Sequence, residues 1–266
     1  MKIIVGATSK LACLLVEELI KTDDQVLSLN RNQTDRWLDC PESLPLTKDV
    51  VVINCAAKTN TRFCEDQRGQ AYKDNVDLAE RIAKICRIKK YENIYISSEV
   101  VFGCNELAHR PGEDESPAPL TWYGITKRMG ELVTLSNGGL VLRLPILVNL
   151  DDHSTIFGKL LNNLQTGNVI QASKYCHSTP VTYSDAVAGI TGLIDSRRYR
   201  YEKVLHLTGD RYVSIFEMFC LIAVQRGLDQ ALIHPLVHGP DETKLLLQYG
   251  GLRSEKIPPI QSSIYT

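Results

Sequence analysis

Tyr123 and Lys127 are the residues of this chain whose types and spacing are best suited to acid–base chemistry. Side chains four residues apart lie on one face of a helix, so the lysine ammonium is expected beside the tyrosine phenol. A nearby positive charge lowers the pKa of a tyrosine from about 10 and favours proton exchange near neutral pH. A positioned acid–base of this kind typically contributes about 10²–10⁴-fold in rate. The pair therefore predicts a proton donor at Tyr123 that is tuned by Lys127.

Gly6 lies in a turn between a short apolar run, residues 2–5, and residues 11–20, whose leucines recur with helical spacing. At such a turn a dinucleotide pyrophosphate meets the N–H groups and the dipole of a helix N-terminus. The usual glycine pattern is incomplete, because Ser9 takes the second place and Ala12 the third. Alanine suits close helix–strand packing, whereas the Cβ of Ser9 is expected to crowd the phosphates. An ordinary strand-to-helix turn is the alternative. The candidate cofactor contacts here are Gly6, Thr8, Ser9, Lys10 and Leu11.

Asn30 and Arg31 end the second apolar run of the chain. An acidic residue at this place would bind the ribose hydroxyls of NAD, whereas an arginine accommodates the 2′-phosphate of NADP. The pair therefore favours NADP, with NAD as the other cofactor to consider. The alternative interpretation of Arg31 is a solvated loop residue.

Residues 49–57 form a near-continuous apolar run, as expected of a strand that is buried on both faces of a parallel sheet. Other runs of strand length alternate with segments of helical periodicity. The alternation predicts an α/β fold, a Rossmann-type doubly wound parallel sheet with helices on both faces. The predicted strands are 2–5, 25–29, 49–57, 93–98 and 140–148, and the predicted helices are 11–20, 70–89 and 124–135.

After about residue 150 the alternation of strand-like and helix-like segments becomes less regular. We expect residues 1–150 to form the dinucleotide-binding core, to which a strand and a helix within 181–210 return. Residues 151–180 and 211–266 are expected to form a small C-terminal α/β lobe that binds substrate. The predicted elements of this part are helices 156–164, 184–194 and 215–226 and strand 203–207. A cleft between core and lobe fits the place where such sheets bind ligands.

Arg143 is charged within the apolar run 140–148, so it needs a buried partner. We expect a structural ion pair, and a phosphate contact is the alternative.

The 30 basic and 31 acidic residues among 266 leave no positive excess for a nucleic-acid backbone. No apolar stretch approaches the roughly 18 residues of a membrane span, and the first residues are too short a run for a signal-peptide core. The eight cysteines are irregularly spaced and lack the two-residue gap of zinc or redox sites. These features predict a cytoplasmic protein with reduced thiols and no metal site.

The strand that ends at Ser97 and Ser98, followed by the Tyr123-Gly-Ile-Thr-Lys127 segment, resembles the extended short-chain dehydrogenase/reductase family. Gly6, residues 54–57 and Asn75 add to this resemblance. Within the family the chain is most similar to sugar-nucleotide 4-ketoreductases of the dTDP-4-dehydrorhamnose reductase type. The similar stretches are residues 56–59 with Glu65, 97–102, 178–181 before Asp185, and 253–256.

The resemblance implies an NADPH-dependent oxidoreductase that reduces a keto sugar nucleotide of the 4-keto-6-deoxy hexose type. The sequence leaves the oligomeric state open, and a homodimer is one assembly to consider. It implies that Ser98 hydrogen-bonds the substrate carbonyl, that Tyr123 protonates the alkoxide after hydride transfer, and that Lys127 binds the nicotinamide ribose. Such chemistry needs one proton donor and one oxyanion stabiliser, and no metal. The other implied cofactor contacts are Asp39 and Cys40 at the adenine, Ala56, Ala57 and Lys58, and Asn75, which supports Lys127 through water. The implied substrate contacts are Ser98, Glu99, Val100 and Ile146.

Several residues depart from the family's pattern. Lys58 stands where an aromatic residue or histidine is usual, Ile146 where a tryptophan is usual, and Arg62 replaces an acidic residue. The stretch 39–49 is too short for the usual third helix. These departures leave the nucleotide, the sugar and the stereochemistry of the product open.

Three other functions are alternatives to a reductase. An epimerase of the same family shares the serine, tyrosine and lysine, but Ser9 and Arg31 fit it less well. A non-catalytic, NADP-binding regulatory subunit is allowed by Ser9 and Lys58, although the intact serine, tyrosine and lysine argue against it. A dehydratase is disfavoured because Val100, and not a second acid, follows Glu99.

Overall fold

The computed structural model describes residues 1–22, 25–40, 49–103, 109–197, 200–236 and 250–265. Its centre is a six-stranded sheet in the order β10-β5-β4-β3-β1-β2, in which every neighbouring pair is parallel. The strands are β1 (Lys2–Val5), β2 (Val26–Leu29), β3 (Val51–Asn54), β4 (Glu92–Ser98), β5 (Leu140–Leu144) and β10 (Val204–His206). The predicted α/β class with a Rossmann-type parallel sheet is confirmed.

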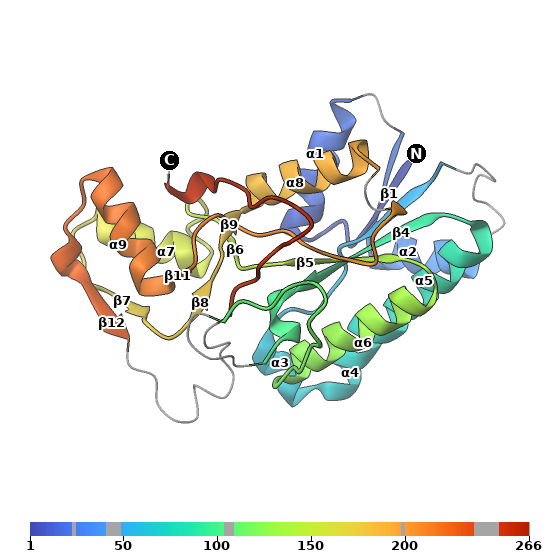
Figure 1. Cartoon of the computed structure of the whole chain (residues 1–266), viewed down its shortest axis with the longest axis horizontal. Coiled ribbons are helices and arrows are strands. Elements are labelled where there is room, and N and C mark those ends of the chain that lie inside the picture. Colours follow the sequence, from blue (N-terminus) through green and yellow to red (C-terminus); the bar gives the residue numbers. More distant parts are fainter. Residues whose placement is uncertain (23–24, 41–48, 104–108, 198–199, 237–249, 266) are drawn as a thin grey trace.

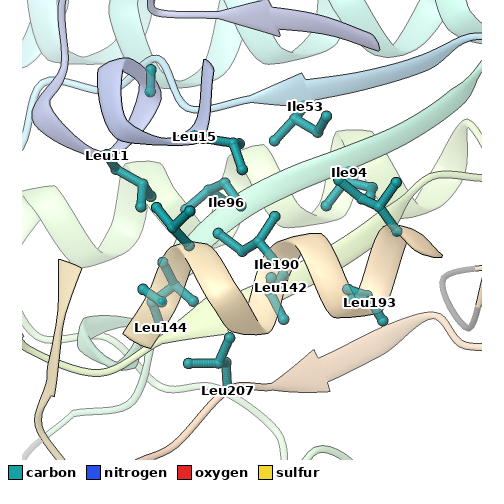
Figure 2. Packing of buried hydrophobic residues seen from close by; sticks show 14 of the residues in the cluster. Leu11, Leu15, Ile53, Ile94, Ile96, Leu142, Leu144, Ile190, Leu193 and Leu207 are labelled. Carbon is teal, nitrogen blue, oxygen red and sulfur yellow. The ribbon is translucent and has the colours of Figure 1, made fainter. Parts of the chain in front are cut away.

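Alternate strand residues supply two separate buried clusters, one on each face of the sheet. Ile4 and Ile53 belong to the cluster under α1 (Lys10–Ile20) and α8 (Tyr183–Asp195). Figure 2 shows leucines and an isoleucine of these helices directed at strand residues of this cluster. Ile3 and Val52 lie in the opposite cluster, with α2 (Arg31–Asp39) and α5 (Leu78–Lys89). The strands are apolar on both faces because helices cover both.

The helix that carries Tyr123 is α6 (Trp122–Ser136), and it begins two residues earlier than the predicted helix 124–135. The hydroxyl of Thr121 caps it by accepting the N–H of Gly124 at 3.1 Å. In Figure 1, α6 and α5 run side by side below the sheet, and α6 also packs against β4. The cap therefore fixes Tyr123 in the first turn, at the end of β4 where Ser98 lies.

The predicted helix 70–89 is interrupted. The structure places α4 (Arg68–Tyr72), a π-helical turn (Lys73–Asp77) and then α5 in its place, and a short α3 (Thr61–Asp66) precedes them. A π-turn inserts an extra residue into the helical repeat, which changes the directions of the side chains around it. We expected the stretch 39–49 to be too short for the third helix that is usual in the family. Most of this stretch, residues 41–48, lies outside the described residues.

The lobe has a buried cluster of its own, in which Phe219 and Ile222 are fully buried. Its helices are α7 (Ile156–Gln165) and α9 (Ile215–Arg226), with 3₁₀ turns at Gln230–Leu232 and Ser263–Tyr265. Its short strand pairs are β7 (Ile170–Ser173) with β12 (Ile233–Leu236), β8 (His177–Ser178) with β11 (Val213–Ser214), and β6 (Leu147–Val148) with β9 (Val181–Thr182). Figure 1 shows α7 and α9 beyond one end of the sheet. The domain boundaries drawn from the sequence stay a prediction.

Within the described residues, no helix combines the length and the apolar character needed to cross a membrane. In the same ranges, no group of three or more histidine, cysteine, aspartate or glutamate side chains is arranged to hold a metal ion.

Candidate active site

A cavity of about 540 Å³ opens at the carboxyl ends of β1 and β3. We call it the crevice. Its lining includes seven residues that the sequence marked as cofactor contacts, together with Thr34, Gln70, Asp74 and Leu78 from α2 and the helical segment after β3. The seven are Gly6, Thr8, Ser9, Arg31, Ala56, Ala57 and Lys58. The structure thus brings residues from three separate turns of the chain to one cavity.

Gly6 holds the turn against the neighbouring strand end. Its φ is +87°, and a Cβ at this position would lie 2.7 Å from the backbone nitrogen of Ala56. Only glycine adopts this conformation freely, and the missing side chain lets the backbone of the two loops come into close contact. The position of the crevice beside the N-terminus of α1 fits the phosphates of a dinucleotide.

Ser9 is the N-cap of α1, and its hydroxyl accepts the N–H of Ala12 at 3.3 Å. Ala12 is fully buried in the core, as expected at the position of close packing. Leu11, by contrast, directs its side chain into the same core, and Lys10 lines a different cavity beside α8 and α9. Of the predicted turn residues, the side chains of Lys10 and Leu11 therefore do not line the crevice.

Asn30 and Arg31 begin α2. Asn30 forms a capping box with Gln33, whereas the Arg31 guanidinium lines the crevice and forms a hydrogen-bonded ion pair with Asp74. Asp39 and Cys40 lie at the other end of α2, outside the crevice lining, and Asp39 pairs with Arg81 at 2.9 Å. A role at the adenine stays a prediction for Asp39 and Cys40.

Asn75 fastens the loop after β3 to α6. Its side-chain oxygen accepts the N–H of Lys58 at 2.7 Å, and its amide donates to the Lys58 carbonyl at 3.1 Å and to the hydroxyl of Thr126 at 2.9 Å. The sequence had implied support of Lys127 through water. In the structure, the direct contacts of Asn75 position the backbone of Lys58 beside the crevice.

Ser98 and Tyr123 meet where β4 ends and α6 begins. Burial raises the pKa of Tyr123 and the charge of Cys64 adds to this, while a hydrogen bond with Ser98 acts in the opposite direction. The sequence-based expectation of a lowered pKa is therefore wrong for this state, because the tyrosine is only 9% exposed. The phenol is accordingly protonated at neutral pH. Cys64, which contacts Tyr123, also donates to the Lys58 carbonyl at 3.3 Å, so this pair lies next to the crevice wall.

Lys127 is on the same helix, but its ammonium is engaged elsewhere. Nζ donates to the carbonyl of Ile96 at 2.7 Å and lies 4.0 Å from the centroid of the Tyr95 ring. Burial lowers the pKa of Lys127 to about 7, although the negative charge of Glu131 opposes the shift. In this state Lys127 is anchored to β4.

Glu99 directly follows Ser98, yet its carboxylate is turned away from the crevice. It accepts hydrogen bonds from the hydroxyl of Ser178 at 2.9 Å and from the N–H groups of Ile146 at 3.1 Å and Gly251 at 2.8 Å. Burial raises its pKa to about 7. Glu99 thus joins the core to the lobe. Ile146 packs against the lobe cluster, and its substrate contact, like that of Val100 beside Tyr123, stays a prediction.

A buried polar network connects β5, α6 and β10, and of its members the sequence pointed only to Arg143. Arg143 forms an ion pair with Glu131, and its Nη1 lies 3.1 Å from Nε2 of His206. His206 in turn lies 2.9 Å from the Arg253 carbonyl, and Glu113 accepts the hydroxyl of Ser254 at 2.5 Å. The expected structural partner of Arg143 is confirmed. A signal of the same kind existed for His206, which lies inside the apolar segment 204–207.

Comparison with known proteins identifies the family. The model of the RmlD substrate binding domain matches residues 1–244. Methionine adenosyltransferase 2 subunit beta of Pongo abelii is 29% identical over 199 residues, which are 71% of this chain and 58% of that protein. The same subunit of Xenopus laevis is 26% identical over 90% of this chain and 75% of that protein. A dTDP-4-dehydrorhamnose reductase of Mycolicibacterium smegmatis is 29% identical over 50% of this chain and 41% of that protein.

Solved structures agree with the fold. The dTDP-4-dehydrorhamnose reductase of Bacillus anthracis, in complex with NADP, superposes with a TM-score of 0.82 at 20% identity over 98% of this chain and 94% of that one. The corresponding reductase of Yersinia enterocolitica gives a TM-score of 0.78 at 24% identity over 96% and 91%. At these identities the structures establish the fold, while the family match spans most of the sequence. The chain therefore belongs to the RmlD substrate binding domain family.

Proposed function

We propose that this protein is an NADPH-dependent oxidoreductase that reduces the keto group of a sugar nucleotide, of the 4-keto-6-deoxy hexose type. The observation that carries the proposal is that Ser98, at the end of β4, and Tyr123, in the first turn of α6, come together beside the crevice lined by Gly6 and the loop after β3. The family match and the motif resemblance point to the same chemistry. The NADP in the Bacillus anthracis structure supports this choice of cofactor.

The residues of the crevice fit a dinucleotide. The turn from Gly6 to Ser9 at the N-terminus of α1 would hold the phosphates, and Ala56, Ala57 and Lys58 would line the opposite wall. Bound NADPH would supply the hydride. The hydroxyl of Ser9 bonds to its own helix, which supports a phosphate turn that tolerates a serine at this place.

Tyr123 would donate the proton, and Ser98 would stabilise the negative charge on the substrate oxygen. Because burial keeps the phenol of Tyr123 protonated, it is the acid available to an alkoxide, which is a far stronger base. The hydroxyl of Ser98 would hydrogen-bond the same oxygen as negative charge develops on it. The ammonium of Lys127 donates to the carbonyl of Ile96. From this position Lys127 would bind the nicotinamide ribose and tune the acidity of Tyr123.

The decisive assay follows NADPH oxidation against a panel of 4-keto-6-deoxy nucleotide sugars. We expect turnover with one member of the panel and a loss of about 10²–10⁴-fold in the Tyr123→Phe variant. The Tyr201→Phe variant is the matched control, because Tyr201 is 84% exposed. NADPH binding without oxidation of any sugar would contradict the reductase.

A second candidate is a dinucleotide-binding subunit without turnover. Two observations favour it: the curated relatives are named as subunits, and the Lys127 ammonium donates to the backbone carbonyl of Ile96 in this structure. It predicts that NADPH binds equally well to the wild type and to the Tyr123→Phe variant, with no oxidation in either. Conversion of a nucleotide sugar into its epimer, with NAD as the cofactor, would instead indicate an epimerase.

Location and assembly belong to the same proposal. The described cysteines are all free thiols, which suits the reducing cytoplasm. A homodimer is the assembly we propose to test, and light scattering on the purified protein measures it directly.

A further inference from the structure

An ion pair spans the crevice between two elements that are distant in the sequence. Arg31, the first residue of α2, donates from Nη2 to Oδ1 of Asp74 in the π-helical turn. The same oxygen accepts the side-chain amide of Gln70 at 3.0 Å. Arg31, Gln70 and Asp74 all line the crevice. The arginine that the sequence assigned to a 2′-phosphate therefore already has an anionic partner inside the proposed cofactor site.

The π-turn explains how the carboxylate reaches this position. Asp74 and Asn75 are consecutive, yet one faces Arg31 and the other bonds to Lys58 and Thr126. π-turns are rare and are often found at functional sites, where the extra residue redirects side chains. The Asp74 side chain is only 17% exposed, and that of Arg31 is 49% exposed. Asp74 is thus held by local structure, whereas Arg31 has room to move.

The two charges have opposite effects on the two cofactors. A guanidinium binds a phosphate dianion through paired N–H donors, and a carboxylate repels the same dianion. A carboxylate at this place accepts hydrogen bonds from ribose hydroxyls, the task usually performed by an acid after the second strand. Here that strand ends in Asn30 and Arg31, and Asp74 brings the carboxylate from another segment.

We propose that Asp74 is a specificity-determining residue, which lowers the preference for a 2′-phosphorylated dinucleotide by competing for Arg31. The inference rests on the proposed function, since it requires the crevice to bind the adenosine end of NAD(P)H. A 2′-phosphate must displace Asp74 from Arg31 or share the guanidinium with it.

The Asp74→Asn substitution tests the competition, because it removes the charge and keeps an oxygen that can accept from Gln70. Binding of NADPH and NADH is measured by isothermal titration calorimetry, so that no turnover is needed. We expect Asp74→Asn to tighten NADPH about tenfold, which is about 1.4 kcal/mol, and to leave NADH unchanged or weaker. In the double variant with Arg31→Ala, the gain for NADPH is expected to disappear.

Asp35→Asn is the matched control. Asp35 also faces Arg31, at 4.0 Å, but it pairs with Arg81 at 2.9 Å and lies outside the crevice lining. The control changes the net charge by the same amount, and it is expected to leave the ratio of the two affinities unchanged.

Two results would overturn the inference while the proposed function stands. One is an equal change in NADPH and NADH affinity on Asp74→Asn, and the other is a gain for NADPH that persists without Arg31. Failure of the wild type to bind either dinucleotide would overturn the proposed function together with the inference. Thermal unfolding of each variant confirms that it is folded during the titration.

Discussion

Arg143 of β5 and Glu131 of α6 meet inside the protein as a two-pronged ion pair, with Nε to Oε1 at 2.8 Å and Nη2 to Oε2 at 2.9 Å. Arg143 is 1% exposed, and Glu131 is fully buried. Although burial raises the pKa of Glu131, the hydrogen bonds and the charge of Arg143 bring it below its ordinary value. The pair joins the helix that carries Tyr123 to the centre of the sheet.

Removal of one partner from this pair should be costly. Arg143→Met leaves the Glu131 carboxylate buried without its main counter-charge, and we expect a loss of about 3–5 kcal/mol in the free energy of unfolding. Arg128→Met is the control, since Arg128 bonds to the same carboxylate at 2.9 Å from a position that is 26% exposed. It should cost less than about 1 kcal/mol. Urea unfolding measures both, and equal losses would contradict the prediction.

Glu99 should make stability fall as the pH rises. Its pKa is about 7 in the folded protein, against 4.5 as the ordinary value, so the folded state holds a proton that the unfolded state releases. The stabilisation is complete below pH 4.5 and is lost towards pH 7, by roughly 3 kcal/mol. Glu99→Gln keeps an acceptor oxygen and should abolish this slope. A pH series of unfolding curves tests it, and parallel curves for the two proteins would refute the assignment.

His206 should produce the opposite slope. Burial and the charge of Arg143 lower the pKa of His206 below 6.5, against the weaker effects of the Arg253 carbonyl and Glu113. Its contribution is therefore present above pH 6.5 and is lost as the pH falls and the buried ring must accept a proton. The slope between pH 6.5 and 4 should be smaller in His206→Gln than in the wild type. A steeper acid transition in the variant would show that another group is responsible.

Gly6→Ala separates backbone strain from crowding. A side chain at φ +87° costs about 1–2 kcal/mol, and contact with the Ala56 nitrogen at 2.7 Å should add about 1–3 kcal/mol. Gly138→Ala is the control, because its φ is +82° and no heavy atom lies within 4 Å of the added Cβ. NADPH affinity should fall at least about tenfold in Gly6→Ala alone. Equal NADPH binding by the two variants would place the phosphates elsewhere.

The local pattern of the sequence was sufficient for the elements of the fold. Apolar runs of strand length, and apolar residues with helical spacing, reflect which faces of each segment are buried. The parallel sheet and most of its helices could therefore be predicted from them. The glycine turn and the tyrosine at the start of a helix were recognisable for the same reason, since their geometry is set within a few residues. The π-turn was not, because its interruption of residues 70–89 leaves no distinct periodicity.

The directions of the charged side chains were decided only by the tertiary structure. Lys127 shares a helix with Tyr123, yet its ammonium bonds to Ile96 of β4, and burial raises the pKa of Tyr123 where the sequence predicted a decrease. Asp74 faces Arg31 and Glu99 joins the lobe through contacts between residues that are far apart in the chain. A sequence records which residues are available, but desolvation and charge pairing depend on which distant segments the fold brings together.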